Sequence, residues 1–357
     1  METEKEEHPD ISIIVPVRNG AAKIKDLLDS LMQVDYDKDK LEIIVVDGNS
    51  TDATREIVSQ YPIKLTLEEK NGVNAARNTG IKKSSGEIIA FTDHDCVVSE
   101  NWVKEIMKYF QDPSVGCVGG KVLRYDDDLL SLYADESLVP VMRIFKKEMV
   151  ISKINSPFTY PVGCNFAVKR EAFEKAGLFD ERFKYGFDEL EFAERICNRG
   201  YKLVLTPNIT VQHKHRSTLS ELLRQTFRYG EGGGLLFKIK GFKSVFTKWI
   251  LLSIFGFLLW LFAVLCTAVY AVFGEFLSVP ALFALLLIPP VVLMLIYTYR
   301  TFKMDDGFYK RIVIYPFLDI ARFVAFVAGG IYYLVRPTKG KTKTEKTSDH
   351  AGWDGKV

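Results

Sequence analysis

Residues 11–17 read Ile-Ser-Ile-Ile-Val-Pro-Val, a short apolar run rich in β-branched residues that is typical of a buried strand. A polar turn and then apolar residues at helical spacing follow this run. The same alternation recurs, with strands expected at 41–46, 64–67 and 87–92 and helices at about 52–60, 72–83 and 100–110. Repeated β-α units predict an α/β fold with a mostly parallel central sheet that is covered on both faces.

The pattern is less regular after about residue 115. We expect strands at 115–123, 162–168 and 201–205, and helices at about 187–199 and 218–229. The charged stretch 126–149 is amphipathic and is a candidate for contact with a membrane. The glycine-rich run 230–234 predicts a flexible junction, so the soluble domain is expected to end near residue 235.

Composition excludes several classes of protein. The 357 residues include 47 basic and 45 acidic ones, and the net charge of +2 gives no electrostatic signature of a nucleic-acid binder. The five cysteines are odd in number and show no paired CxxC spacing, which indicates reduced, structural thiols. The acidic lead at 1–10 lacks the basic start and apolar stretch of a secretory signal, so export of the first domain by cleavage is not expected.

The carboxyl-terminal third predicts a small all-α membrane domain. The stretches 249–273 and 279–299 carry no charged residue, and at about 1.5 Å per residue each suffices to cross the roughly 30 Å hydrocarbon core of a bilayer. A third apolar stretch, 312–335, contains Asp319 and Arg322 on one helical face. It either spans the membrane or lies in its interface, so the domain has two or three crossings and follows a basic junction at 236–248.

The distribution of basic residues predicts a multi-pass protein of the cell membrane with a cytoplasmic amino-terminal domain. The loop 274–278 between the first two stretches contains no basic residue, whereas the flanking segments contain Lys238, Lys240, Lys243, Lys248, Arg300, Lys303, Lys310 and Arg311. The basic tail 336–357 is low in apolar residues and is expected to be disordered. Three crossings would export this tail against the positive-inside rule, which keeps an interfacial third helix open.

Acidic residues follow two of the expected strands. Asp47 closes the second strand and Asp93 closes the fourth, at the edge where open parallel sheets bind ligands. Alternation along Asp93-His94-Asp95 places both carboxylates on one side, which is a candidate site for Mg²⁺ or Mn²⁺ bridging a diphosphate. A solvated acidic turn is the alternative. The absence of GxGxxG after the first strand and of a P-loop argues against those nucleotide folds.

Four segments in order then carry a specific resemblance. They are Val15-Pro16-Val17-Arg18-Asn19, Asp47-Gly48-Asn49-Ser50-Thr51-Asp52, Asn74-Ala75-Ala76-Arg77-Asn78-Thr79-Gly80 and Asp93-His94-Asp95. Together they resemble the nucleotide-sugar half of the inverting family-two glycosyltransferases of the GT-A fold, although the Asp-Gly turn is one residue longer. The resemblance implies a GT-A domain over about 11–235. It also implies that Asp47 receives the base and ribose, that Arg77 lies near the phosphates, and that Asp93 and Asp95 hold the metal. The implied donor-binding set is Pro16, Val17, Arg18, Asp47, Asn74, Arg77 and Asp93.

The second half matches the acceptor side of the same family. Gly163 to Arg170 resembles its acceptor-side strand, and Asp188 to Arg195 resembles its E-D-x-D-L-x-x-R helix, which places Glu189 at the catalytic base. A shift of one residue would give that role to Asp188. His213 resembles a histidine that completes the metal shell in related enzymes, and residues 225–229 resemble a Q-x-x-R-W motif. The implied acceptor and diphosphate set is Gly163, Asn165, Gln225, Arg228 and Tyr229; a core histidine and an ordinary amphipathic helix are the structural alternatives.

The resemblance implies a membrane-anchored, metal-dependent inverting glycosyltransferase. It would move a sugar from a nucleoside diphosphate sugar to a lipid-linked acceptor in the synthesis of a cell-surface polysaccharide or a glycoprotein glycan. The acceptor would be a polyprenyl or dolichyl phosphate, or a lipid-linked saccharide, and other partners would be membrane lipids and membrane proteins. The alternatives are a subunit of a processive polysaccharide synthase, a catalytically silent membrane scaffold, and a nucleotidyltransferase; the last usually has a glycine-rich basic loop that this sequence lacks.

Overall fold

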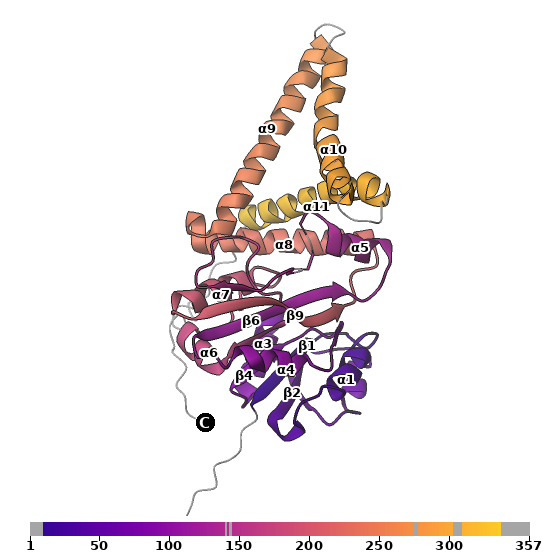
Figure 1. The fold of residues 1–357 in the computed structure, drawn as a ribbon. Coiled ribbons are helices and arrows are strands. Elements are labelled where there is room, and N and C mark those ends of the chain that lie inside the picture. Colours follow the sequence, from indigo (N-terminus) through magenta and orange to yellow (C-terminus); the bar gives the residue numbers. More distant parts are fainter. Residues whose placement is uncertain (1–9, 140, 143–144, 274–277, 303–308, 337–357) are drawn as a thin grey trace, which may run out of the picture. The chain divides into compact units, whose positions relative to one another are not determined.

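The computed structural model describes residues 10–139, 141–142, 145–273, 278–302 and 309–336 (Figure 1). They form two compact units: the first contains 10–135 and the residues from 141 to 215, and the second contains 136–139 and the residues from 216 to 335. The expected acidic lead before residue 10, the loop at 274–277 and the tail after residue 336 lie outside the described residues.

The amino-terminal half of the first unit has the predicted alternation. Strands β1 (Ile11–Val17), β2 (Leu41–Asp47), β3 (Lys64–Leu67) and β4 (Ile88–Phe91) are all parallel, in the order β3-β2-β1-β4. The helices in this half are α1 (Ile24–Met32), α2 (Thr54–Val58), α3 (Val73–Lys83) and α4 (Trp102–Tyr109). Strand β1 is buried along its whole length because β2 and β4 pair with it on both sides.

The other half makes the sheet mixed. Strand β8 (Phe166–Lys169) pairs antiparallel with β4, and the sheet continues through β6 (Val115–Arg124), β9 (Lys202–His213) and β5 (Cys96–Val98), with β7 (Met149–Ile151) also on β9. Of these pairings only β6–β9 is parallel. The associated helices are α5 (Leu129–Glu136), α6 (Arg170–Ala176) and α7 (Asp188–Asn198).

Strand β9 is longer than the expected 201–205. It continues past Pro207 to His213, and the β6–β9 register shifts between Gly119 and Lys121, opposite this proline. A proline interrupts a strand least where the ladder is already irregular, since no paired N–H is lost there. The extension brings His213 alongside the residues that follow β4.

The carboxyl ends of β1 and β2 are tied together by their loops. The N–H of Gly48 donates to the Val17 carbonyl at 2.7 Å, and the N–H of Thr51 donates to the Asn19 side chain at 2.8 Å. Asn19 and Asn49 have φ values of 53° and 57°, which asparagine tolerates better than most residues. This edge of the sheet is therefore a firm support for a ligand site.

The second unit contains four long helices, α8 (Leu219–Lys240), α9 (Val245–Phe273), α10 (Ser278–Phe302) and α11 (Tyr309–Val335). By length and composition, three of them are able to cross a membrane: the apolar segments are Val245–Tyr270, Pro280–Thr301 and Arg311–Val335. Within this unit α11 lies alongside α8 (Figure 1). These helices indicate membrane association, and the number of crossings stays a prediction.

The prediction of a flexible junction at 230–234 is wrong, because α8 runs through these glycines without a break. Close packing against α11 offsets the usual cost of glycine in a helix. A Cβ on Gly230 would clash with the carbonyl of Phe326, and a Cβ on Gly329 would clash with the carbonyl of Phe227. The glycines thus let the two helix backbones touch. The compact first unit runs to His215 before the helices of the second unit begin, and the expected limits of the GT-A domain at 11–235 stay a prediction.

Polar groups of the second unit pair with one another. Arg311 donates two hydrogen bonds to the Glu136 carboxylate, at 2.7 and 2.8 Å, and Arg322 donates to the Val139 carbonyl at 3.0 Å. The segment 136–139 is therefore held by α11. On the same helix, Asp319 accepts a 2.6 Å hydrogen bond from Tyr297 of α10. Ionisable groups in apolar helices are expected to be paired in this way.

Candidate active site

The carboxylate of Asp95, just beyond β4, lies against the end of β9. Asp95 is 3% exposed, and its Oδ1 lies 3.3 Å from His213 Nε2 while its Oδ2 lies 3.6 Å from Lys23 Nζ. Burial disfavours the charged carboxylate, but the charge and hydrogen bond of His213 outweigh burial and hold the pKa of Asp95 well below its usual range. Burial by itself would lower the pKa of His213, but the charge and hydrogen bond of Asp95 outweigh burial and raise this pKa to about 9.

These side chains fit a divalent cation. Donor atoms of Asp95, Cys96 and His213 all lie within 4.8 Å of one another, and all three residues are buried. A carboxylate and an imidazole suit Mn²⁺, whereas a thiol is a softer ligand that prefers other metals. Asp93 is not part of this cluster; its Oδ1 lies 4.0 Å from Arg77 Nη2, and burial raises its pKa. The geometry thus brings Asp95 and His213 together and leaves Asp93 beside them, near Arg77.

The two candidate bases begin helix α7 in different environments. Phe187, directly before the helix, has a φ of 67°, a left-handed conformation that is strained for a bulky residue. Asp188 is 3% exposed and forms a 2.7 Å ion pair with Arg77 Nη1, whereas Glu189 Oε1 lies 3.6 Å from the same nitrogen. Asp188 therefore anchors Arg77, and Glu189 has the weaker tie to it.

Glu189 is poised to exchange a proton near neutral pH. Burial, reinforced by the charge of Asp188 and opposed by Arg77, raises the pKa of Glu189 to about 8. Its carboxylate faces the backbone of Gly163, where a Cβ would clash with Oε1. The missing side chain at Gly163 leaves the space that Glu189 occupies.

Arg77 connects the acids of α7 with the acids that follow β4. It is 3% exposed, pairs with Asp188, and donates to the Gly163 carbonyl at 3.1 Å. Its Nη2 also lies within 4.0 Å of Asp93. The guanidinium is thus engaged by protein groups on several sides, and its expected place near the donor phosphates stays a prediction.

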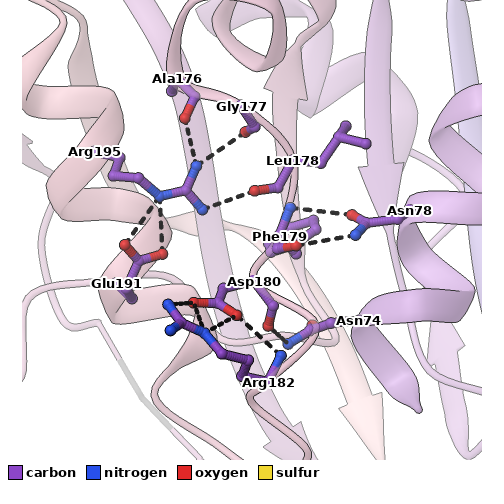
Figure 2. Close-up of polar contacts among 10 residues, drawn as sticks. All are labelled: Asn74, Asn78, Ala176, Gly177, Leu178, Phe179, Asp180, Arg182, Glu191 and Arg195. Atoms are coloured by element: carbon purple, nitrogen blue, oxygen red, sulfur yellow. Dashed lines mark hydrogen bonds and ion pairs between the residues drawn. The ribbon is translucent and has the colours of Figure 1, made fainter. Parts of the chain in front are cut away.

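The loop that leads into α7 is held from α3. The Asn78 side chain exchanges two hydrogen bonds with the backbone of Phe179, at 2.9 and 3.0 Å (Figure 2). Asn74 donates to the carbonyls of Phe183 at 3.0 Å and Asp180 at 3.4 Å, and it is 1% exposed. Asn74, predicted to bind the donor, therefore has its amide committed to this loop.

A second clamp comes from α7 itself. Figure 2 shows Arg195 directed at the chain between α6 and the loop, where it donates to the carbonyls of Ala176, Gly177 and Leu178. Its Nε also pairs with Glu191, one turn earlier, at 2.9 Å. Arg195 of α7, together with Asn74 and Asn78 of α3, thus fixes the position of α7. The two candidate bases at the start of that helix are fixed with it.

Asn165 is a core residue. It is fully buried, its Oδ1 accepts from the Trp102 indole at 2.9 Å, and its Nδ2 donates to the carbonyls of Lys121 and Ile209 at 2.8 and 3.2 Å. Its side chain ties β6, β9 and α4 together and exposes no surface to an acceptor. The expectation of direct acceptor contact is therefore corrected for Asn165.

The donor side is built around Asp47. Its Oδ2 accepts from the Ser50 N–H at 3.0 Å and lies 3.4 Å from Arg55 Nε. Its Oδ1 is buried and has no hydrogen-bond partner among the described residues. A buried carboxylate oxygen without a partner is costly unless a ligand completes it. Pro16 and Val17 form the buried end of β1, and Arg18 is exposed.

Residues of the second predicted acceptor motif lie on α8 in the second unit. Gln225 Nε2 donates to Tyr229 Oη at 3.1 Å, and Arg228 lies on the same helix. Their role at an acceptor or diphosphate stays a prediction.

Sequence reasoning missed Lys23, His215 and Asp135. Lys23 contacts Asp95 from the start of α1, and His215 contacts His213. Asp135, which comes from α5, lies 3.4 Å from His215. The His213-x-His215 spacing was visible in the sequence, but no nearby residue indicated that Asp135 would lie beside these histidines.

Comparisons with known proteins find relatives among glycosyltransferases. A family model described as "Glycosyl transferase family 2" matches residues 12–177. Glycosyltransferase AglE of Haloferax volcanii is 33% identical over 231 residues, which cover 63% of this chain and 73% of that protein. The dolichyl N-acetyl-alpha-D-glucosaminyl phosphate 3-beta-D-2,3-diacetamido-2,3-dideoxy-beta-D-glucuronosyltransferase of Methanococcus voltae is 26% identical over 285 residues, which cover 72% of this chain and 81% of that protein.

A solved structure shares the fold. The mannosyltransferase PcManGT of Pyrobaculum calidifontis, in complex with GDP-Man and Mn²⁺, superposes with a TM-score of 0.61 at 23% identity, over 92% of this chain and 88% of that one. The shared fold is of the GT-A type, and the family model and relatives identify the chain as a glycosyltransferase. More narrowly, the chain belongs to glycosyltransferase family 2.

Proposed function

We propose that this protein is a membrane-anchored, inverting glycosyltransferase that moves one sugar from a nucleoside diphosphate sugar to a hydroxyl group of a lipid-linked saccharide. The observation that supports it most is the placement of Glu189, which faces the backbone of Gly163. The neighbouring Asp188 is instead held in an ion pair with Arg77.

The character of the base distinguishes between acceptors. In an inverting transfer the acceptor oxygen attacks the anomeric carbon opposite the leaving diphosphate, and a hydroxyl loses its proton in that step. Glu189, whose pKa is about 8, is suited to take this proton in its ionised form, and the fraction of molecules in that form grows as the pH rises toward 8. A phosphate acceptor is already ionised and needs no base. The Methanococcus relative is named as a transferase acting on dolichyl N-acetyl-alpha-D-glucosaminyl phosphate, which supports a sugar hydroxyl as acceptor.

The donor and metal sites complete the proposal. The Oδ1 atom of Asp47, which has no hydrogen-bond partner among the described residues, accepts a hydrogen bond from an N–H of the nucleobase or an O–H of the ribose. Asp95 and His213, with Asp93 beside them, hold Mn²⁺ or Mg²⁺. A bound cation neutralises the charge that builds up on the leaving diphosphate.

We also propose an arrangement in the membrane. Helices α9 and α10 cross it as a hairpin, and α11 lies in the interface along α8, because α11 carries Asp319 and Arg322 and packs on α8 through glycines. The positive-inside rule places the catalytic unit on the cytoplasmic side.

Two measurements on the detergent-purified full-length protein test the function. Thermal stabilisation by a panel of nucleoside diphosphate sugars, with Mn²⁺, Mg²⁺ or EDTA, is expected to show a metal-dependent shift with one or two donors. No shift with any donor in folded protein would contradict the transferase assignment.

The second measurement compares acceptors. Given the matching donor, we expect transfer of one sugar to a polyprenyl-linked monosaccharide and none to the bare polyprenyl phosphate. Glu189→Gln serves as the matched control, since it keeps donor binding and removes the base. Transfer to the bare phosphate at an equal rate in this variant would overturn the proposed acceptor.

A further inference from the structure

We infer that His215 and Asp135 are positioning residues, which orient His213 and fix its ring proton so that the Nε2 atom of His213 is free to bind the metal. The inference deepens the proposed function and rests on its metal site. It concerns a buried chain of four side chains, Asp135, His215, His213 and Asp95, that we call the histidine relay.

The relay is continuous and shielded from water. His213 Nδ1 lies 3.2 Å from His215 Nδ1, and His215 Nε2 lies 3.4 Å from Asp135 Oδ1. The side chains of His215 and Asp135 are each 3% exposed. Among the described residues, neither His215 Nε2 nor Asp135 Oδ1 has a hydrogen-bond partner elsewhere. The two atoms therefore face each other, and nothing else in this part of the chain satisfies them.

The backbone around His213 is already fixed. In β9, His213 stands opposite Cys96 of β5 on one side and Arg124 of β6 on the other. The N–H of Lys214 donates to the Asp95 carbonyl at 2.9 Å, and the N–H of Tyr125 donates to the His213 carbonyl at 3.0 Å. Since the main chain cannot shift, the remaining freedom is the rotation of the imidazole and the position of its proton. Those are the two properties that a hydrogen bond to Nδ1 controls.

Hydrogen-bond chemistry gives the relay a direction. A carboxylate only accepts, so the proton between His215 and Asp135 belongs to His215 Nε2. A neutral His215 then presents a lone pair at Nδ1, and His213 must donate its own Nδ1–H to it. His213 Nε2 shares its other proton with Asp95, and once a cation displaces that proton the atom would be left with a lone pair facing the metal site. Partners of this kind commonly orient metal-binding histidines.

The other end of the relay is anchored as well. Asp135 Oδ2 accepts from the N–H and Nη1 of Arg124, at 3.2 and 3.3 Å. Both oxygens of Asp135 thus face donors, Arg124 on one side and His215 on the other. An amide in place of this carboxylate cannot meet both. If the oxygen of the amide faced Arg124, its NH₂ group would face His215 and donate to it. Every hydrogen bond of the relay would then be reversed, and the ring proton of His213 would lie on Nε2.

The test is Mn²⁺ binding to the full-length protein, followed by electron paramagnetic resonance without donor or acceptor. The free-Mn²⁺ signal gives the dissociation constant, and pulsed spectra of bound Mn²⁺ report a directly bound ¹⁴N. We expect a ¹⁴N coupling in the wild type. Asp135→Asn and His215→Leu are expected to weaken Mn²⁺ binding about 10–100-fold and to lose the coupling. His215→Gln, whose amide oxygen still accepts from Nδ1–H, is expected to keep it.

Asp127→Asn is the matched control. Asp127 also pairs with Arg124, at 2.9 Å, but it is 85% exposed and does not touch the relay, so we expect unchanged binding. Wild-type Mn²⁺ binding without a ¹⁴N coupling, or an unchanged coupling in Asp135→Asn, would overturn the inference and leave the transferase intact. If the wild type bound Mn²⁺ neither alone nor in the presence of any nucleoside diphosphate sugar of the panel, that result would instead contradict the proposed metal site. Because Asp135→Asn is nearly isosteric, it serves as the test if His215→Leu does not fold.

Discussion

Glu189→Gln is expected to make the protein more stable while it abolishes sugar transfer. The pKa of Glu189 is about 8 in the folded protein, against an ordinary value of 4.5. At pH 7 the unfolded chain has released this proton and the folded one has kept it. Each pKa unit is worth about 1.4 kcal/mol. Between the ordinary pKa and pH 7, the raised pKa of Glu189 therefore lowers the free energy of unfolding by up to about 3 kcal/mol. Glutamine does not ionise and avoids this loss.

The sign and the pH window follow from the raised pKa. The wild type loses stability as the pH rises from about 4.5 to about 8, because only the unfolded state ionises in that interval. For a unit of this size, 1 kcal/mol shifts Tm by about 2–4 °C, so the variant should melt about 6–12 °C higher at pH 7. The gap should close toward pH 4.5.

The assay is thermal unfolding of both proteins in detergent from pH 4.5 to 8, together with transfer rates. We expect kcat to fall by about 10²–10⁴-fold in Glu189→Gln. Asp188→Asn is the comparison: it leaves Arg77 buried without its tightest partner and should lower stability by about 3–5 kcal/mol. A variant Tm that is equal to or below that of the wild type at pH 7 would refute the reasoning, and full transfer in Glu189→Gln with loss in Asp188→Asn would move the base to Asp188.

Three further predictions concern the donor site and the helices. Gly163→Ala should lower kcat by about 10²-fold without unfolding the protein, because the new Cβ displaces the Glu189 carboxylate; near-normal kcat in a steady-state assay would contradict this. Asp95→Asn should abolish the part of the donor-induced thermal shift that EDTA removes, worth about 2.7 kcal/mol at a hundredfold excess over Kd, while a retained Mn²⁺ effect would exclude Asp95 from the metal site. Gly329→Ala should lower Tm by forcing α11 away from the α8 backbone, whereas Gly256→Ala on α9, where a Cβ would meet nothing within 4 Å, should not; equal effects would show that the close packing is unimportant.

Local sequence was sufficient for the parallel half of the sheet. The apolar run at 11–17 became β1 with the same bounds, and the run at 41–46 became β2 with Asp47 added. Strand periodicity and turn residues act within a few positions there, so no distant information was needed. The acids at the ends of β2 and β4 could be placed for the same reason.

Features decided by distant packing could not be predicted in this way. The glycines at 230–234 look like a linker until α11 lies against them. Asn165 matched an acceptor motif, but the partners that bury it come from β6, β9 and α4. Asp135 belongs to a charged stretch that gave no sign of its place beside His215. In each instance the partner that sets the role is remote in the sequence.

The seam between α8 and α11 also decides where this chain can be shortened. A form that ends before α11 exposes the glycine face of α8, where bare backbone rather than side chains meets the neighbour. It also removes Arg311 and leaves the Glu136 carboxylate without its bidentate partner. A water-soluble version for crystallisation or inhibitor screening should therefore end at His215, where the first unit closes, and carry glutamine at position 136.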